Sequence, residues 1–431
     1  NRIRMYNAEL EKMPLDKMRA LQSARLAQMV KKVYEYVPFY KNQFDQIGLK
    51  PEDIRSVEDL PKLPFTRKTD LRDNYPYGMF ARPMDEIRRI HASSGTTGKP
   101  TVVGYTSYDL DVFDEVVSRS LACAGARPGM ILHNAYGYGL FTGGLGMHGG
   151  ATKLGMAVIP VSGGMTVRQL TILQDFKPEV ICCTPSYAQT LSEEFAKLGI
   201  DTGDLAVKYA ILGAEPWTEA IRDQVEAGLQ VTATNIYGLS EIIGPGVSQE
   251  DFEEKGTGSY IWEDHFFPEV VDKETGDPLP YGEEGVLVFT TLTKEAFPVL
   301  RYWTNDICSI QYDPNAKRTH IKMSVIKGRA DDMLLIRGVN LFHTQVEEVI
   351  HEMEYLSPNY RLIVEKAGTM DTVKVEVECV QGVDPTNPEF AQQLKNKIKD
   401  TIGLSMKIDL KASNSIPRSQ GGKLSRILDK R

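Results

Sequence analysis

The stretch from residue 152 to residue 239 constrains the fold most, because short apolar runs alternate there with segments of helical periodicity. We predict strands at 156–161, 180–183, 209–212 and 231–237, and helices at 166–176, 186–198 and 218–228. This alternation is typical of a parallel sheet whose crossover helices cover its faces. It therefore predicts an α/β fold.

The remainder of the chain has a different texture. Strands of antiparallel character are expected over 246–313, and beyond residue 330 short strands and helices mix over about 100 residues. A chain of 431 residues is long enough for two domains. We predict a large N-terminal domain with mixed and parallel sheets over 1–329, and a small α+β C-terminal domain over 330–431.

Composition excludes several classes of protein. The net charge of −8, with no block of Lys and Arg, argues against nucleic-acid binding. Five cysteines without a CxxC pair are typical of a reducing compartment. No apolar run approaches the ~18 residues of a membrane span, so we expect a cytoplasmic protein.

Residues 93–100 read Ser-Ser-Gly-Thr-Thr-Gly-Lys-Pro between two β-prone runs, which favours a hairpin. Glycine lets backbone N–H groups converge on an anion, the hydroxyls add donors, and Lys99 adds charge. The stretch is not a Walker A loop, because Ser93 and Pro100 stand where Gly and Ser or Thr are required. A phosphate-binding loop is the hypothesis, and a mobile polar turn is the alternative.

Two predicted strand ends are candidate ligand sites, because ligands of open α/β sheets lie outside the carboxyl ends of the strands. At 213–216, Gly-Ala would let a flat base approach the backbone. At 237–241, Tyr237 offers a ring for stacking and Glu241 a carboxylate for Mg²⁺, although a lone Glu is usually just solvated. Asp306 could accept hydrogen bonds from two ribose hydroxyls.

The segment 136–144 interleaves aromatic residues with glycine, which suits a pocket for an aryl group. Core aromatics beside a turn are the alternative. We predict that the acid pocket is built from Tyr136, Phe141, Gly143, Ala214 and Ile236. The small residues Gly143, Gly144 and Ala214 are expected to leave room for a flat ring.

Two further features concern single side chains. Lys423 follows Gly-Gly near the end of the chain. A terminal Lys is usually a solvated charge, and the two glycines allow a loop insertion but do not show it. The spacing of His265, Cys308 and His320 matches no zinc pattern.

Taken together, these stretches resemble the adenylate-forming superfamily of acyl- and aryl-CoA synthetases over essentially the whole chain. Residues 93–100 resemble its phosphate-binding motif, 237–241 its adenine- and Mg-binding motif, 328–332 its hinge motif, and 417–423 its catalytic-lysine motif. Asp306 stands at the ribose-binding position, without the usual preceding Gly. The runs 37–40, 60–66, 89–92 and 262–265 look like the branch that activates phenylacetate.

The resemblance implies a role for each matching residue. Lys423, Glu241 and Thr97 would be catalytic, with Glu241 binding Mg²⁺; Asp331 would be the hinge; Arg337 and Gly338 would bind coenzyme A. Nucleotide contacts would come from Ser93, Ser94, Gly95, Thr96, Thr97, Gly98, Lys99, Gly213, Ala214, Glu215, Pro216, Asn235, Ile236, Tyr237, Gly238, Ser240, Asp306 and Arg329.

The implied reaction has two steps, formation of an acyl-adenylate from ATP and then acyl transfer to coenzyme A. Cofactors would be ATP, Mg²⁺ and coenzyme A, and the resemblance suggests a homodimer. The acid stays open among phenylacetate, a hydroxyphenylacetate, indoleacetate and benzoate. Alternatives are an aryl-activating enzyme that loads a carrier protein, and a silent nucleotide-binding protein on the same fold.

Overall fold

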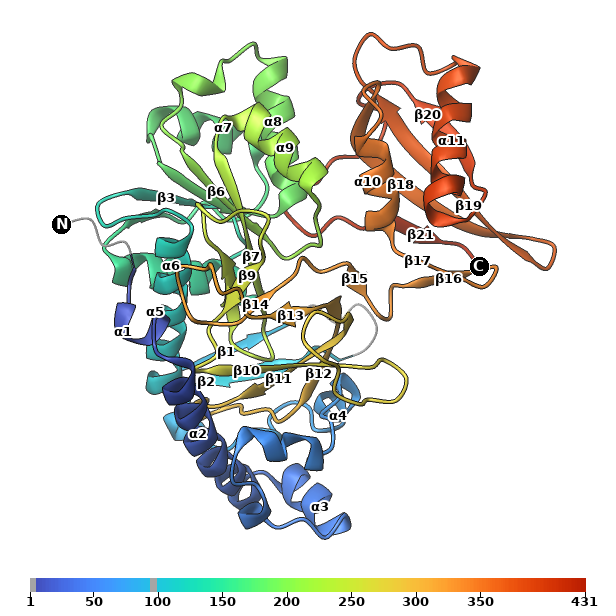
Figure 1. Cartoon of the computed structure of the whole chain (residues 1–431). Coiled ribbons are helices and arrows are strands. Elements are labelled where there is room, and N and C mark those ends of the chain that lie inside the picture. The colour runs from blue at the N-terminus through green and yellow to red at the C-terminus, as the bar shows by residue number, and fades with distance from the viewer. Residues whose placement is uncertain (1–4, 94–98) are drawn as a thin grey trace. The chain divides into compact units, whose positions relative to one another are not determined.

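The computed structural model describes residues 5–93 and 99–431 (Figure 1). The chain divides into two compact units. Unit 1 comprises Asn1–Cys183, Leu205–Ala214 and Thr232–Ser324. Unit 2 comprises Thr184–Asp204, Glu215–Val231 and Val325–Arg431. Compact units and mobile domains are different divisions of a chain, so the domain limits at residues 329 and 330 stay a prediction.

In the described part of unit 1, nine strands form one mixed sheet in the order β13-β14-β9-β8-β7-β6-β5-β3-β4. The strands from β4 to β7 pair in parallel, and β8, β9, β14 and β13 continue the sheet with antiparallel pairs. The predicted α/β frame is thereby confirmed. The strands are β3 (Ile131–Asn134), β4 (Ala157–Ile159), β5 (Val180–Cys183), β6 (Tyr209–Gly213), β7 (Thr232–Leu239), β8 (Gly244–Glu250), β9 (Ser259–Ile261), β13 (Ile310–Gln311) and β14 (Lys322–Met323).

Two further groups of strands belong to unit 1. β1 (Arg89–Ala92) and β2 (Val102–Tyr105) form the antiparallel hairpin predicted around residues 93–100. β10 (Phe266–Val271), β11 (Gly285–Thr291) and β12 (Tyr302–Cys308) pair in antiparallel order, as expected for this region.

The helices of unit 1 depart from the predictions at one place that matters for the site. The Gly-rich stretch 142–144, where no helix was predicted, is the first turn of α6 (Thr142–Leu154). A Cβ on Gly150 would lie 2.2 Å from Val117 Cγ1, and one on Gly146 would lie 2.4 Å from the Phe113 ring. Glycine thus allows α6 to pack closely on α5 (Ser107–Cys123), and this contact outweighs its poor helix propensity.

Among the other helices of unit 1, α3 begins at Pro38, and proline is suited to the first position of a helix. These other helices are α1 (Ala8–Glu11), α2 (Leu15–Tyr36), α3 (Pro38–Gln46), α4 (Lys68–Asp73) and α7 (Thr166–Asp175), with 3₁₀ turns at Pro51–Asp53, Val57–Lys62 and Met84–Glu86.

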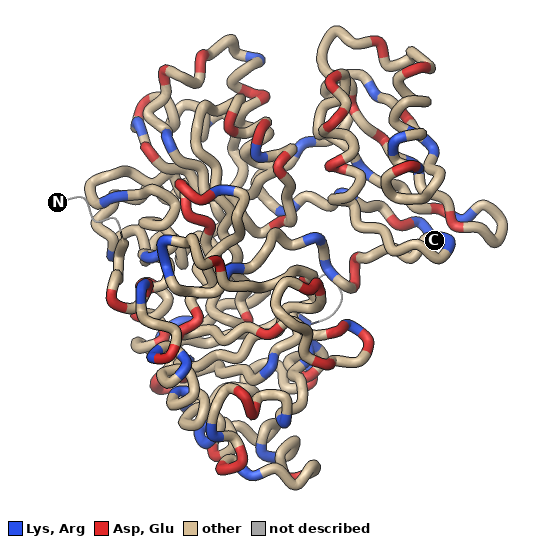
Figure 2. Tube along the Cα trace, in the orientation of Figure 1, with Lys and Arg blue, Asp and Glu red and all other residues tan. Residues whose placement is uncertain are grey.

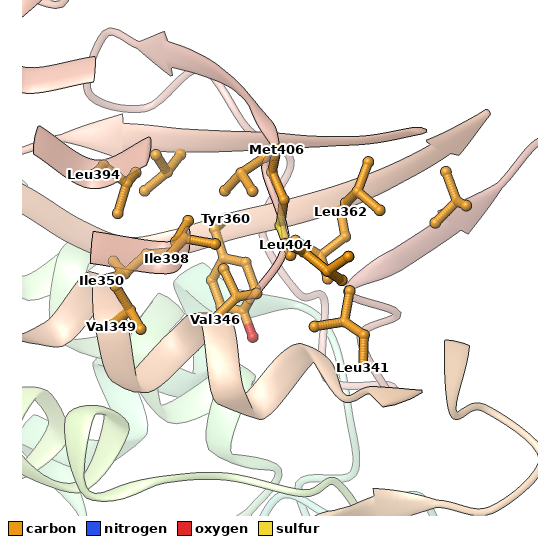
Figure 3. Packing of buried hydrophobic residues seen from close by; sticks show 14 of the residues in the cluster. Leu341, Val346, Val349, Ile350, Tyr360, Leu362, Leu394, Ile398, Leu404 and Met406 are labelled. Atoms are coloured by element: carbon orange, nitrogen blue, oxygen red, sulfur yellow. The ribbon is translucent and has the colours of Figure 1, made fainter. Parts of the chain in front are cut away.

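Unit 2 has its own core. Figure 3 shows Val346, Val349 and Ile350 of helix α10 facing Tyr360 and other residues of the neighbouring strands. Apolar residues recur at helical spacing on α10 (His343–His351) and at every second position on β19 (Met370–Cys379). Each element therefore turns one apolar face toward this core. The elements are α8 (Pro185–Lys197), a 3₁₀ turn (Thr202–Asp204), α9 (Glu219–Leu229), β15 (Gly328–Arg329), β16 (Leu334–Ile336), β17 (Val339–Leu341), α10 (His343–His351), β18 (Leu356–Ala367), β19 (Met370–Cys379), α11 (Pro388–Ile402), β20 (Lys407–Lys411) and β21 (Ile427–Asp429).

Acidic and basic residues are interspersed along both units (Figure 2). Among the described helices, none combines the length and apolar character needed to cross a membrane.

Candidate functional site

The hairpin β1–β2 supports the candidate phosphate loop. At its mouth the Ser93 N–H donates to the Thr101 carbonyl at 2.9 Å, and the Thr101 N–H donates to Ser93 Oγ at 3.1 Å. Lys99 Nζ lies 5.1 Å from the centre of the Tyr75 ring. The residues predicted to hold phosphate between them, Ser94, Gly95, Thr96, Thr97 and Gly98, lie outside the described residues.

The same hairpin contacts the segment that directly precedes α6. The Ala92 N–H and His91 Nδ1 both lie within hydrogen-bonding distance of the Leu140 carbonyl, at 3.0 and 2.9 Å. Burial lowers the pKa of His91, so the ring is neutral near pH 7 and serves as a backbone anchor.

The ends of β6 and β7 lie side by side, because Gly213 pairs with Ile236 in parallel register. A Cβ on Gly213 would lie 2.2 Å from the Ile236 carbonyl oxygen, so only glycine fits this approach. Ala214, the next residue, is exposed and has a φ of 75°, a left-handed conformation that is costly for alanine. Strain at an exposed strand end is typical of a ligand contact, but the nucleotide role of both residues stays a prediction.

Tyr237 and Asp306, predicted separately as adenine and ribose contacts, are brought together by β7 and β12. The Tyr237 hydroxyl donates to Asp306 Oδ2 at 2.5 Å. Burial, followed by the charge of Asp306, raises the pKa of Tyr237 well above its ordinary value, so the phenol stays protonated. The tyrosine therefore orients the carboxylate that was predicted to accept ribose hydroxyls.

Glu241 follows β7 and is 8% exposed. Within residues 5–93 and 99–431, its carboxylate makes no hydrogen bond or ion pair. Mg²⁺ is usually bound by only one or two carboxylates together with substrate phosphates and water. A carboxylate on a buried residue, with no hydrogen-bonding partner in the described part of the chain, fits that requirement.

Lys294 is a residue of this region that sequence reasoning missed. It is 1% exposed, and its Nζ donates to the Glu241 carbonyl at 3.3 Å. Burial lowers the pKa of Lys294 to about 8, against the attraction of the Asp109 and Glu241 carboxylates. Asp109 also accepts from the N–H groups of Glu295 and Ala296 at 2.8 and 2.9 Å, which fixes the segment that bears Lys294.

The residues predicted for the acid pocket differ in how far they are exposed to solvent. Tyr136 and Ile236 are buried, whereas Phe141 is 47% exposed. The expectation that Gly144 leaves room for a ring is wrong, because a Cβ there would lie 2.6 Å from the Gly137 carbonyl oxygen. Gly143 is also closely packed, with its Cβ position 3.3 Å from Tyr136 Cβ. These glycines permit helix packing, and the pocket itself stays a prediction.

In unit 2, Arg337 and Gly338 form the turn between β16 and β17. Their φ angles of 47° and 79° are both positive, as in the type I′ turns of two-residue hairpins. Arg337 Nη2 donates to the Ser405 carbonyl at 2.8 Å, and Leu335 on the adjacent strand is 58% exposed. The turn exposes a cation and an apolar side chain, and its contact with coenzyme A stays a prediction.

Three further predicted residues of unit 2, Asp331, Glu215 and Lys423, lie outside helices and strands, whereas Arg329 is the last residue of β15. The exposed Asp331 accepts from Arg329 Nε at 3.0 Å, and Lys423 is exposed. Glu215, predicted to contact the nucleotide, accepts hydrogen bonds from Ser186 and from the Leu424 N–H, and its nucleotide contact stays a prediction.

Side chains that might have bound a structural metal have other partners. His265 Nδ1 lies 2.7 Å from Thr293 Oγ1, and the nitrogens of His320 lie near the carbonyls of Ile261 and Leu10. In the described parts of the chain no three His, Cys, Asp or Glu side chains gather as a metal site would require.

Comparison with known proteins adds family models and relatives. A model described as "AMP-binding enzyme" matches residues 36–292, and one described as "AMP-binding enzyme C-terminal domain" matches residues 338–431. The chain is 58% identical to the phenylacetate-coenzyme A ligase of Thermus thermophilus, covering 99% of this chain and 100% of that relative. It is 49% identical to the phenylacetate-coenzyme A ligase of Escherichia coli, covering 98% and 97%.

Solved structures agree with this result. A crystal structure of 2-hydroxyisobutyryl-CoA ligase in the postadenylation state, in complex with R3-HIB-AMP, is 26% identical with a TM-score of 0.92. The match covers 98% of this chain and 92% of that chain. A structure of the same ligase with 2-HIB-AMP and CoA, in the thioesterification state, has a TM-score of 0.74 and covers 99% and 92%.

Proposed function

This chain belongs to the family of AMP-binding enzymes, and we propose that it activates phenylacetate or a close arylacetate with ATP and transfers the acyl group to coenzyme A. One observation supports the proposal above all others. Curated relatives named phenylacetate-coenzyme A ligase are 47–58% identical to the chain over 98–99% of its length.

The proposed reaction has two steps, adenylation of the acid and transfer of the acyl group to coenzyme A. A carboxylate oxygen of the acid attacks the α-phosphorus of ATP, and the bond to pyrophosphate breaks to leave an acyl-adenylate. The coenzyme A sulfur then attacks the acyl carbon as its proton is lost, and AMP leaves with the electron pair of the cleaved bond.

The protein's task in the first step is to orient the reactants and to offset phosphoryl charge. Asp306, held by the Tyr237 hydroxyl, would accept from the ribose hydroxyls. Lys423 would donate to the oxygens of the α-phosphate and the attacking carboxylate. When bound at Glu241, Mg²⁺ would supply positive charge to the phosphates.

The second step would use the C-terminal region. We propose that residues 330–431 change position about Asp331, and that the Arg337–Gly338 turn contacts coenzyme A. Asp331→Pro fixes φ near −65° and should preserve one half-reaction while abolishing the other. Equal retention of both half-reactions would exclude the hinge at this residue.

We extend the proposal to the setting of the enzyme. It would act in the cytoplasm as a homodimer in the catabolism of arylacetates. Analytical ultracentrifugation would test the dimer, and fractionation of the source cells would test the location.

A substrate panel tests the function itself. Pyrophosphate release and thioester formation are measured with phenylacetate, a hydroxyphenylacetate, indoleacetate, benzoate, acetate and hexanoate, with and without coenzyme A. We expect the highest kcat/KM for an arylacetate and a thioester product only with coenzyme A. Preference for hexanoate would overturn the aryl assignment, and adenylate formation without transfer to coenzyme A would favour a carrier-loading enzyme.

A further inference from the structure

The loop before Lys423 is held by a charged cluster within unit 2. Arg418 Nε donates to Glu193 Oε2 of α8 at 2.5 Å, and Arg418 Nη2 donates to Glu378 Oε1 of β19 at 2.8 Å. Burial opposes the charge of Arg418, but its hydrogen bonds to Glu378 and Glu193 outweigh this and raise its pKa. Glu378 is 1% exposed, so the cluster is anchored in a buried carboxylate.

Other side chains of α8 contact the chain on both sides of Lys423. Thr190 Oγ1 donates to the Ser419 carbonyl at 3.0 Å, and Arg426 Nη2 donates to Gln189 Oε1 at 3.1 Å. Residue 193 lies beside residues 189 and 190 on the surface of the helix, because it is four positions from the first and three from the second. This face of α8 therefore fixes the loop before and after the lysine.

Glu215 completes the support. Its Oε1 accepts from the N–H and hydroxyl of Ser186, at 3.0 and 2.7 Å. Its Oε2 accepts from the N–H of Leu424, the residue directly after Lys423. Both carboxylate oxygens thus bind protein groups, one at the start of α8 and one in the lysine loop.

We propose that Glu193 and Glu215 are positioning residues for adenylate formation, which act by fixing the backbone that bears Lys423. The inference rests on the role proposed above for Lys423. A lysine side chain is long and flexible, so the site of its Nζ depends on a fixed backbone. Small displacements of a charge-stabilising group cause large losses of rate. For Glu215, which was predicted as a nucleotide contact, we propose this positioning role, and the two roles are separated by experiment below.

The chain offers a matched pair of variants for Glu193. Glu194 is the next residue on the same helix, but it pairs with Lys197 at the surface. Adenylate formation is measured as pyrophosphate release from phenylacetate and ATP, and thioester formation is measured from preformed phenylacetyl-adenylate and coenzyme A. Glu193→Ala should lower kcat for adenylate formation about tenfold or more, with thioester formation within about twofold of wild type. Glu194→Ala should change neither.

Conservative variants separate positioning from folding. Glu193→Gln retains an oxygen acceptor and should recover part of the lost rate. If Glu193→Ala does not fold, Thr190→Val removes one hydroxyl donor with little change of shape and should show a smaller loss in the same half-reaction. Equal losses in both half-reactions would overturn the proposal.

Glu215→Ala distinguishes the two roles considered for that residue. A positioning residue should lower kcat for adenylate formation and leave the KM for ATP within about twofold. A tenfold rise in that KM with unchanged kcat would return Glu215 to the adenine site and overturn its part of the inference.

A double-mutant cycle separates this inference from the proposed function. In a Lys423→Ala background, Glu193→Ala should cause no further loss of adenylate formation, and an additive loss would overturn the inference. If Lys423→Ala alone leaves adenylate formation unchanged, the role proposed for Lys423 is wrong. If Lys423→Ala is slow and Glu193→Ala is not, the positioning role alone is wrong.

Discussion

The two units present their candidate site residues on different kinds of structure. In unit 1, Gly213, Tyr237 and Asp306 lie on strands of packed sheets. In unit 2, Gly338 lies in a hairpin turn and Lys423 on an exposed loop. The first group is fixed by the core of its unit, and the second by a limited number of hydrogen bonds and ion pairs.

This difference predicts whether a substitution lowers the stability of the protein or the rate of its reaction. A buried side chain on a strand contributes to the free energy of unfolding, so its loss should mainly lower stability. A residue on an exposed loop contributes little to folding, and its loss should change a rate while stability stays constant. The following predictions test this division, from the largest expected effect to the smallest.

The largest effect is expected in the buried ion pair of unit 1. Arg119 donates to both oxygens of Asp264, at 2.8 and 3.0 Å, and both side chains are 0% exposed. Arg119→Ala removes the guanidinium that pairs with the buried Asp264 carboxylate and, among the described residues, leaves only the His265 ring, 3.4 Å away, beside it. This should lower the free energy of unfolding by about 3–5 kcal/mol. Urea denaturation measures this, with Lys41→Ala in the exposed Lys41–Asp45 pair as control. That control should lose less than about 1 kcal/mol, and similar losses in both variants would contradict the division.

Lys423→Ala is the counterpart in unit 2. It should slow adenylate formation by about 10²-fold or more, the scale of losing one charge-stabilising donor, with an unchanged urea midpoint. Stopped-flow pyrophosphate release measures the rate. Thioester formation from preformed adenylate should persist. A shifted urea midpoint would show that this loop contributes to folding after all.

His133 on β3 tests the core of unit 1 through pH. It is 0% exposed, its Nε2 lies 2.9 Å from Gln169 Oε1, and burial lowers its pKa to about 4. Between pH 6.5 and 4 the unfolded chain binds a proton at this site that the folded chain does not, so stability falls as pH falls through this window. From pH 7 to pH 5 the wild type should lose about 2 kcal/mol more than His133→Leu, measured by urea denaturation. Parallel pH profiles of the two proteins would show that His133 has the same pKa in the folded chain as in the unfolded chain.

The smallest effect is expected at Ala214, an exposed residue of unit 1 at a strand end. Ala214→Trp should reduce kcat/KM for phenylacetate relative to acetate by about tenfold, because it would fill the predicted acid pocket. Ala214→Gly is the control, since glycine accepts the φ of 75° and adds no volume. An unchanged ratio in the tryptophan variant would place the pocket elsewhere.

Much of this structure could be predicted from local patterns. The alternation over 152–239 indicated the parallel strands β4 to β7, since the residue pattern alone contains the periods of strand and helix. The β-prone runs beside Ser93 and Pro100 indicated the hairpin β1–β2. The linear motifs indicated the family, because a motif is a property of neighbouring residues in one chain.

Other features depended on residues far apart in the sequence. Helix α6 forms in a Gly-rich stretch because its glycines let it pack closely on α5. Local helix propensity does not contain this contact. Lys294 is buried beside Glu241, 53 residues earlier, on a segment that Asp109 fixes. Glu215 accepts from the N–H of Leu424, 209 residues later.

The sequence by itself therefore determined the strand and helix order of the sheet and the family, since periodicity and motifs are local. The tertiary structure decided which polar groups meet. It paired Tyr237 with Asp306, buried Lys294 behind Glu241, and gave the lysine loop its support from Glu193 and Glu215. The physical reason is that hydrogen bonds and burial depend on distance in space, which packing sets and spacing along the chain does not.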